Sequence, residues 1–355
     1  MVKRHKIPKN NCKFERKSLF SQANSLLFMS TYSEITSCIS EEMSRYHEEF
    51  ERILHTRIPL ADNIIRYFLD RKGKQMRPIM AILAAKIAKG TVTDETINGA
   101  VALELLHNAS LMHDDVVDNS DQRRGVDTIN KVWDNHIAVL MGDFFLAKCL
   151  VSSNATGSLT ISRILADMVI RLAEGELEQQ ANARAHMMSE NAYFSVISGK
   201  TASLFSGCLK IGAISVGASE KDVEKLGEIG ELMGLVFQIR DDIFDYFPST
   251  DEVGKPTGHD ILEGKITLPL IFALNQTSNE ENQKMRRLVL DNKTFSQEQI
   301  SQLVEYAKAV GGIDYAQAKM KNLAFKAKNL LLSFEDSEYR TALMTLLDYF
   351  IERQK

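Results

Sequence analysis

The chain has 355 residues, of which 44% are hydrophobic and 25% are charged, and its formal net charge at pH 7 is -4. This composition is that of an ordinary globular protein with enough apolar material for a large core. The near balance of charge creates no global field that would attract nucleic acid or an anionic membrane, so we expect no nucleic-acid partner. No apolar run approaches the length that spans a bilayer, which predicts a chain without a transmembrane segment.

The cysteine pattern excludes a disulfide framework. The four cysteines lie far apart and form no Cys-x-x-Cys pair. They are expected to be reduced thiols of an intracellular protein, with Cys149 and Cys208 in the core.

The first 33 residues are basic and contain a single acidic residue, Glu15. Such a leader, with its serines and asparagines, is also typical of an organelle transit peptide. We favour the simpler interpretation, a disordered extension over residues 1–33 ahead of a catalytic domain over 34–355. That interpretation predicts a cytoplasmic protein.

The rest of the chain predicts helices throughout. There is no proline between Pro78 and Pro248, and apolar residues recur at helical spacing, as over 161–172. Ser296 and Gln299 form a capping-box pattern, and Gly311 should end the helix that they open. No linker or repeat divides the chain, which indicates one all-α domain.

The first acidic motif lies in the segment 101–119, VALELLHNASLMHDDVVDN. On an α-helix, Asp114 and Asp118 share one face, whereas Asp115 points about 100° away. The second motif lies in the segment 234–247, GLVFQIRDDIFDYF, and repeats the arrangement. There Asp241 and Asp245 share a face and Asp242 lies beside it.

Three carboxylates within five residues repel one another, and the apolar flanks of both motifs imply partial burial, which is costly without compensation. Carboxylates supplied in ones and twos and completed by phosphate and water suit Mg²⁺. A single motif would more readily be a solvated acidic face. Two copies inside apolar helices favour a metal site.

A di-iron carboxylate bundle is an alternative metal site in a helical protein. It requires two Glu-x-x-His motifs. Only Glu104 and His107 fit that pattern, so the di-iron interpretation is weak.

Basic residues suggest an anion site. Lys74 and Arg77 lie at the start of a predicted helix, where the macrodipole disfavours cations unless an anion is bound. A solvated loop explains these residues alone equally well. Arg123-Arg124, Lys200-Thr201 and the segment 254–265 add basic groups in polar or glycine-rich surroundings. Together with the acids they predict a site for two polyanions, one held through metal and one held directly.

The segments GKQMRP, HNASLMHDDVVDNSDQRRG, SGKTASLF, GLVFQIRDDIFDY and GKPTGHDILEGKITLPL occur in an order and spacing that resembles the trans-type polyprenyl diphosphate synthases. The resemblance covers roughly residues 45–350. It implies an all-α, single-domain isoprenoid synthase-type helical bundle around a central cavity, and a homodimer.

The resemblance also implies the reaction, a 1'-4 condensation of isopentenyl diphosphate with an allylic diphosphate, in a pathway such as quinone side-chain synthesis. It implies about two to three Mg²⁺ ions. Metal would be bound by Asp114, Asp118 and Asp241, supported by Asp115, Asp242 and Asp245. The allylic diphosphate would be bound by Arg123, Lys200, Thr201, Gln238, Lys255 and Lys265. Isopentenyl diphosphate would be bound by Lys74, Arg77, His107 and Arg124.

Product length is predicted from the residues before Asp114. Ala109 and Ser110 are small, whereas bulky aromatic residues there stop growth at short products in the resembling family. The hydrocarbon tunnel should therefore stay open for another helical turn, about 5.4 Å, with Leu165 or Met168 as its floor. We expect a product of roughly 30 to 50 carbon atoms. The alternatives are close helix packing at Ala109 and a farnesyl- or geranylgeranyl-length product.

Two other functions share part of this pattern. A terpene cyclase would have the fold and the first acidic motif but no need for Lys74 and Arg77. A non-catalytic partner subunit would be expected to have lost one acidic motif, and both are present.

Overall fold

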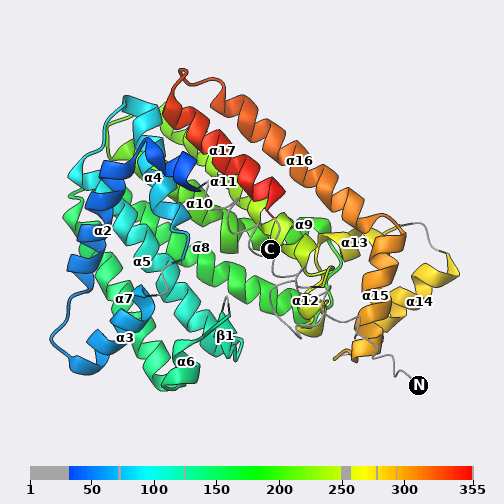
Figure 1. Ribbon diagram of the computed structural model, residues 1–355. Coiled ribbons are helices and arrows are strands. Elements are labelled where there is room, and N and C mark those ends of the chain that lie inside the picture. Colours follow the sequence, from blue (N-terminus) through cyan, green and yellow to red (C-terminus); the bar gives the residue numbers. More distant parts are fainter. Residues whose placement is uncertain are drawn as a thin grey trace, which may run out of the picture.

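The computed structural model of the chain describes residues 32–70, 73–123, 125–248, 257–276, 279–292 and 294–353. These residues are almost entirely helical (Figure 1). The longer helices are α2 (Ser40–Leu54), α3 (Pro59–Leu69), α4 (Met76–Lys89), α5 (Asp94–Val117), α7 (Asn135–Ala155), α8 (Leu159–Arg184), α10 (Ser203–Ile214), α11 (Glu220–Phe244), α14 (Glu280–Asp291), α15 (Gln297–Ala309), α16 (Gly312–Leu331) and α17 (Glu338–Glu352). The predicted all-α fold is confirmed. Nearly all of the N-terminal extension predicted over 1–33 lies outside the described residues.

Short elements join the long helices. They are α6 (Ile129–Val132), α9 (Glu190–Ile197), the π-helical turn η1 (Ser198–Ala202), α12 (His259–Leu262) and α13 (Leu268–Leu274). The strands β1 (Gln122–Arg123) and β2 (Val126–Asp127) form a small antiparallel hairpin directly after α5.

The centre of the bundle is built on α5, α10 and α11. Helix α7 packs along α5, while α10 packs against α4 and α11, and α16 and α17 lie along α11 (Figure 1). The stretch 100–106 of α5 is buried on every face. This stretch therefore lies in the core, with Glu104 as its one charged residue.

Capping residues place the helix ends, and the ends place the acidic motifs. Thr93 caps the start of α5, and Asp118 follows its last residue. Ser219 caps α11, and Asp245 follows its last residue. Both acidic motifs therefore occupy the final turn of a long helix, where the macrodipole is negative.

Helix α4 has the opposite arrangement, with basic residues at its N-terminus, where the macrodipole is positive. Its N-cap, Gln75, adopts a left-handed conformation with φ 47°, and Pro78 lies in the first turn. Lys74 and Arg77 thus flank a helix N-terminus, as predicted. The capping box of Ser296 and the left-handed Gly311 at φ 82° are also confirmed.

Helix α8 approaches the backbone of η1 closely at Gly175, and this contact positions Lys200. A Cβ atom on Gly175 of α8 would lie 2.8 Å from the backbone nitrogen of Lys200 and 3.2 Å from the carbonyl carbon of Gly199. Only glycine lets α8 and η1 touch in this way. The contact brings Lys200 next to Glu176.

Helix α7 bears on the expectation that the chain has no transmembrane segment. This 21-residue helix is long and apolar enough to span a membrane by length and composition, although 39% of the apolar window is buried within the fold. The reason is that α7 carries apolar residues both on its α5 side and on its exposed side. The prediction that Cys149 and Cys208 are free and buried is confirmed, and Cys12 lies outside the described residues.

Candidate active site

The first acidic motif divides its three carboxylates between two roles. Asp115 is buried, accepts a hydrogen bond from Nε of Arg123 at 2.9 Å and forms an ion pair with Nη2 of the same side chain at 2.8 Å. Asp114 and Asp118 lie on the other face of the turn, and within the described part of the chain their carboxylates form no hydrogen bond or ion pair. Asp114 and Asp118 are therefore the pair that can bind an external cation.

The second motif divides in the same way. Asp242 is buried and accepts from the hydroxyl of Tyr193 at 2.6 Å and from Nε2 of Gln238 at 2.8 Å. Asp245 accepts from the backbone N–H groups of residues 259 and 260, each at 3.0 Å, and so holds the start of α12. Asp241 is the more exposed carboxylate and pairs with Arg353 at 2.7 Å.

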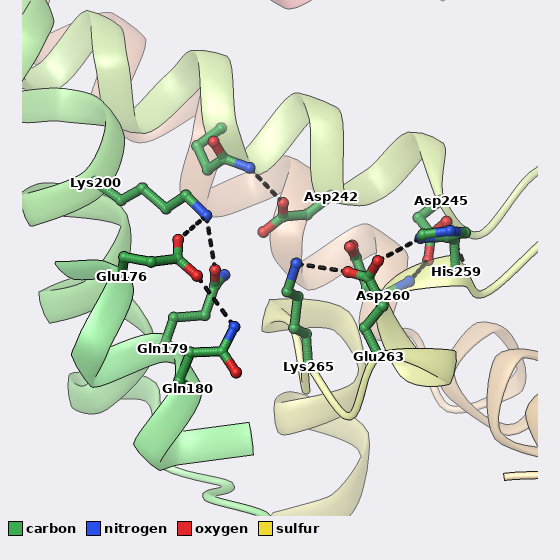
Figure 2. A network of polar contacts seen from close by, with 11 residues as sticks. Glu176, Gln179, Gln180, Lys200, Asp242, Asp245, His259, Asp260, Glu263 and Lys265 are labelled. Carbon is green, nitrogen blue, oxygen red and sulfur yellow. Dashed lines mark hydrogen bonds and ion pairs between the residues drawn. The ribbon is translucent and has the colours of Figure 1, made fainter. Parts of the chain in front are cut away.

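Two predicted lysines, Lys200 and Lys265, lie near Asp242 of the second motif (Figure 2). Lys200 of η1 donates to Glu176, and also to Gln179 at 2.9 Å. Lys265 pairs with Glu263 at 2.6 Å. Both lysines also interact electrostatically with the first motif, because Lys200 lowers the pKa of Asp114 against the larger effect of burial, and Asp118 raises the pKa of Lys265.

A cavity of about 180 Å³ opens beside the second motif. Its polar lining comes from α8, α9, η1, α11 and the segment around α12. The lining includes Tyr193, Lys200, Thr201, Gln238, Asp242, Asp260 and Lys265. Thr201 donates to Oε1 of Gln238 at 2.8 Å. The structure thus gathers four of the six predicted allylic-site residues in one place, whereas Arg123 is engaged by Asp115 and Lys255 lies outside the described residues.

The residues predicted to bind isopentenyl diphosphate lie near the start of α4 and on α5. Lys74 donates to the hydroxyl of Tyr349, and the Arg77 guanidinium lies 5.8 Å from the ring centroid of Phe205. His107 is half-buried on α5, two turns before Asp114. Arg124 lies outside the described residues.

The residues predicted to control product length lie apart from this cavity. Ala109 is buried on α5, and Leu165 and Met168 are buried on α8. A Cβ atom on Gly207 would lie 2.1 Å from the sulfur of Met168, so this side chain lies directly against α10. Ser110 donates to the carbonyl of His107 at 2.9 Å. The tunnel floor at these residues stays a prediction.

Burial and mutual repulsion raise the pKa values of several carboxyls at the site. Burial raises the pKa of Asp114, and Glu176 and Asp118 raise it further, while Lys200 opposes the shift. Burial also raises the pKa of Asp115 against the opposing effect of Arg123. A bound cation would relieve this cost.

The donor set fits a hard divalent cation. Among the residues that the structure describes, no three carboxylate, imidazole or thiol groups converge on one point. A pair of carboxylates is nevertheless what Mg²⁺ uses when phosphate oxygens and water complete its shell. Asp114 and Asp118 supply that pair, whereas Asp241 is engaged by Arg353.

Four residues of the site were not among the predicted ones: Glu176, Tyr193, Asp260 and Arg353. Asp260 lies in the basic segment 254–265 that the sequence singled out, and burial raises its pKa well above the usual 3.8, with further increases from Asp242 and Asp245. Tyr193 and Arg353 have no local sequence signal, because they reach the site only through tertiary packing.

The titration of Asp242 makes a testable prediction about stability. Burial raises its pKa from 3.8 to about 7, and the charges of Asp241 and Asp245 add to the shift, while hydrogen bonds from Tyr193 and Gln238 oppose it. The folded state therefore holds this proton more tightly than the unfolded state does. The resulting stabilisation is complete below the unfolded pKa and is lost as the pH rises through about 7.

Asp242→Asn removes this titration. We expect the melting temperature of the metal-free variant to rise relative to wild type as the pH increases from about 5 to about 8. Asp167→Asn, at an exposed carboxyl of α8, is the matched control and should track wild type. If the difference in melting temperature between Asp242→Asn and wild type did not change with pH, Asp242 would not have the raised pKa assigned to it.

Comparison with known proteins agrees with this geometry. A family model described as polyprenyl synthetase matches residues 58–307. The octaprenyl diphosphate synthase of Haemophilus influenzae is 34% identical over 320 residues, which cover 90% of this chain and 96% of that protein. Among solved structures, a geranylgeranyl pyrophosphate synthase from Bacteroides thetaiotaomicron is 39% identical with a TM-score of 0.78, covering 91% of this chain and 100% of that one. A polyprenyl synthase from Caulobacter crescentus, complexed with calcium and isoprenyl diphosphate, is 30% identical with a TM-score of 0.84, covering 91% and 98%. The chain therefore belongs to the polyprenyl synthetase family.

Proposed function

We propose that the protein is a Mg²⁺-dependent prenyltransferase that condenses isopentenyl diphosphate with an allylic diphosphate and makes a long-chain all-trans polyprenyl diphosphate. The observation that carries the proposal is the pairing of charges at helix ends. Two acidic motifs lie at helix C-termini beside Lys200 and Lys265, and two basic residues lie at the N-terminus of α4. Such a site has room for two diphosphates held in different ways.

The allylic half of the site would promote ionisation. Breaking the allylic C–O bond transfers its electron pair to the departing pyrophosphate, so negative charge grows on that group. Lys200 and Lys265 would stabilise the growing charge, and Gln238 would donate to a diphosphate oxygen. Asp114, Asp118 and Asp241 would hold the metal, which when bound supplies Lewis-acid stabilisation of the same oxygens.

The isopentenyl half of the site would position the nucleophile. Lys74 and Arg77 would bind its diphosphate together with backbone N–H groups of α4, and His107 of α5 would contribute as well. The double bond then attacks the allylic cation and forms a carbon–carbon bond, a step in which positioning supplies much of the rate. A proton is lost afterwards, and we assign it to the departing pyrophosphate.

The reaction assignment is tested by pyrophosphate release from purified protein with Mg²⁺ and an allylic diphosphate. Wild type should release pyrophosphate only when isopentenyl diphosphate is present. Asp114→Asn should lower turnover by about two orders of magnitude or more, because stabilisation of the transition-state charge is lost. Asp167→Asn should keep wild-type turnover.

Other outcomes would favour the alternatives. Release without isopentenyl diphosphate would indicate a terpene cyclase, and no release under any condition would indicate a non-catalytic partner subunit. Wild-type turnover in Asp114→Asn at ordinary Mg²⁺ would refute the metal assignment.

We also propose that the product is longer than geranylgeranyl diphosphate, as expected for a quinone side chain. The support is the small Ala109, which lies five residues before Asp114 on α5, and the burial of Leu165 and Met168 on α8. Ala109→Phe should shorten the main product by closing the tunnel, while condensation continues. Leu165→Ala should lengthen it.

Chromatography of the dephosphorylated products measures both effects. The control is Ala155→Phe, at the exposed end of α7, which should leave the product length unchanged. Ala138 of the same helix is fully buried and therefore does not suit this purpose. A wild-type product of farnesyl length would refute the open tunnel and leave the reaction assignment standing.

We propose that the protein is a homodimer that buries the exposed face of α7. Val139, Leu140, Leu150 and Val151 recur at helical spacing on that face and are 40%, 51%, 61% and 55% exposed. An isologous contact between two copies would cover this apolar stripe.

Leu150→Glu should convert the dimer to monomer in light scattering, because it buries a charge at the contact. Phe325→Glu, on α16 at 64% exposure, is the matched control and should stay dimeric. A wild-type monomer, or a dimer that Leu150→Glu leaves intact, would overturn this interface.

A further inference from the structure

Tyr193 is a buried residue of α9 that ends a chain of hydrogen bonds into the cavity. Its hydroxyl donates to Oδ2 of Asp242 at 2.6 Å, and Oδ1 of the same carboxylate accepts from Nε2 of Gln238 at 2.8 Å. Oε1 of Gln238 in turn accepts from the hydroxyl of Thr201 at 2.8 Å. The chain links α9 to η1 through α11.

The chain fixes which way the Gln238 amide is turned. Both oxygens of Asp242 accept in this chain, so Oδ1 binds the amide nitrogen of Gln238 and not the amide oxygen. The amide group has two N–H donors, and Asp242 engages one. Because Gln238 lines the cavity, the other N–H remains for an anionic ligand there.

Hydrogen-bond donors are the main compensation for Asp242. The two nearby lysines, Lys200 and Lys265, pair with Glu176 and Glu263. The charged neighbours that act on Asp242 most strongly are other acids, at positions 241 and 245. A buried carboxylate in these surroundings depends on donors such as the Tyr193 hydroxyl to stay in one orientation.

We propose that Tyr193 is a positioning residue for the allylic diphosphate, which it serves by holding Asp242 so that Gln238 presents an N–H donor to the cavity. This inference rests on the function proposed above. Without the Tyr193 hydroxyl, Asp242 keeps a single side-chain donor and can rotate. The Gln238 amide can then turn over and point its carbonyl oxygen at the diphosphate, which repels it.

The test compares Tyr193→Phe with Tyr246→Phe. Tyr246 is also buried near the second motif, but among the described residues its hydroxyl contacts Thr267 at 3.2 Å and no carboxylate. Calorimetry would measure the Kd of an allylic thiolodiphosphate in the presence of Mg²⁺, and steady-state kinetics would measure the KM of each substrate. Thermal melting would report whether each variant is folded.

Tyr193→Phe should raise the Kd and the KM of the allylic substrate about ten-fold or more, because a hydrogen bond to a charged group is lost. The KM of isopentenyl diphosphate should change less than about two-fold. Tyr246→Phe should leave both substrates at wild-type values. In a Gln238→Ala background, Tyr193→Phe should have no further effect, because the amide that it orients is gone.

Wild-type affinity of folded Tyr193→Phe for the allylic analogue would overturn the inference. So would a loss of that affinity on Tyr193→Phe that is as large in the Gln238→Ala background as in the wild-type background. An equal rise in the KM of both substrates would also overturn it, since that pattern indicates general damage. These outcomes are distinct from a failure of the proposed function, which would appear as wild-type protein that releases no pyrophosphate with isopentenyl diphosphate.

Discussion

The structure depends on charged side chains placed at helix ends where the helix macrodipole has the same sign of charge. The acidic motifs lie at the C-terminal ends of α5 and α11, where the helix macrodipole already carries negative charge, and Lys74 and Arg77 lie at the positive end of α4. Each placement is unfavourable in the protein alone and becomes favourable when a ligand of opposite charge arrives. A cation relieves the two acidic ends, and an anion relieves the basic one. Under the proposed function, a metal-bound diphosphate would relieve the acidic ends and a second, metal-free diphosphate would relieve the basic one.

Within this arrangement the repeated motif separates positioning from binding. In each motif the second aspartate is buried and held by protein donors, as in the pairing of Asp115 with Arg123 and of Asp242 with Tyr193. Asp245 holds the start of α12 and so the segment that carries Lys265. Asp114 and Asp118 make no such contact in the described part of the chain, whereas Asp241 is paired with Arg353. The held residues rigidify the turn so that the binding residues need little reorganisation.

The helical fold and most of the site could be predicted from the sequence because their signals are local. The spacing of Asp114 and Asp118, the caps at Thr93 and Ser296, and the basic start of α4 each depend on residues within one or two turns. Tyr193 and Arg353 could not be predicted, since they meet Asp242 and Asp241 across long sequence separations. The exposed apolar face of α7 was also missed, because a helix that is apolar on two sides looks like a core helix in sequence.

The central claim is that one diphosphate is bound through metal at the aspartates and the other directly at the start of α4. Calorimetric titration of the same protein with and without Mg²⁺ tests it most directly, using isopentenyl diphosphate and an allylic thiolodiphosphate as ligands. The account predicts that metal-free protein binds isopentenyl diphosphate but not the allylic analogue, and that Mg²⁺ restores binding of the analogue. Equal dependence of both ligands on Mg²⁺, or tight binding of the allylic analogue without metal, would contradict it.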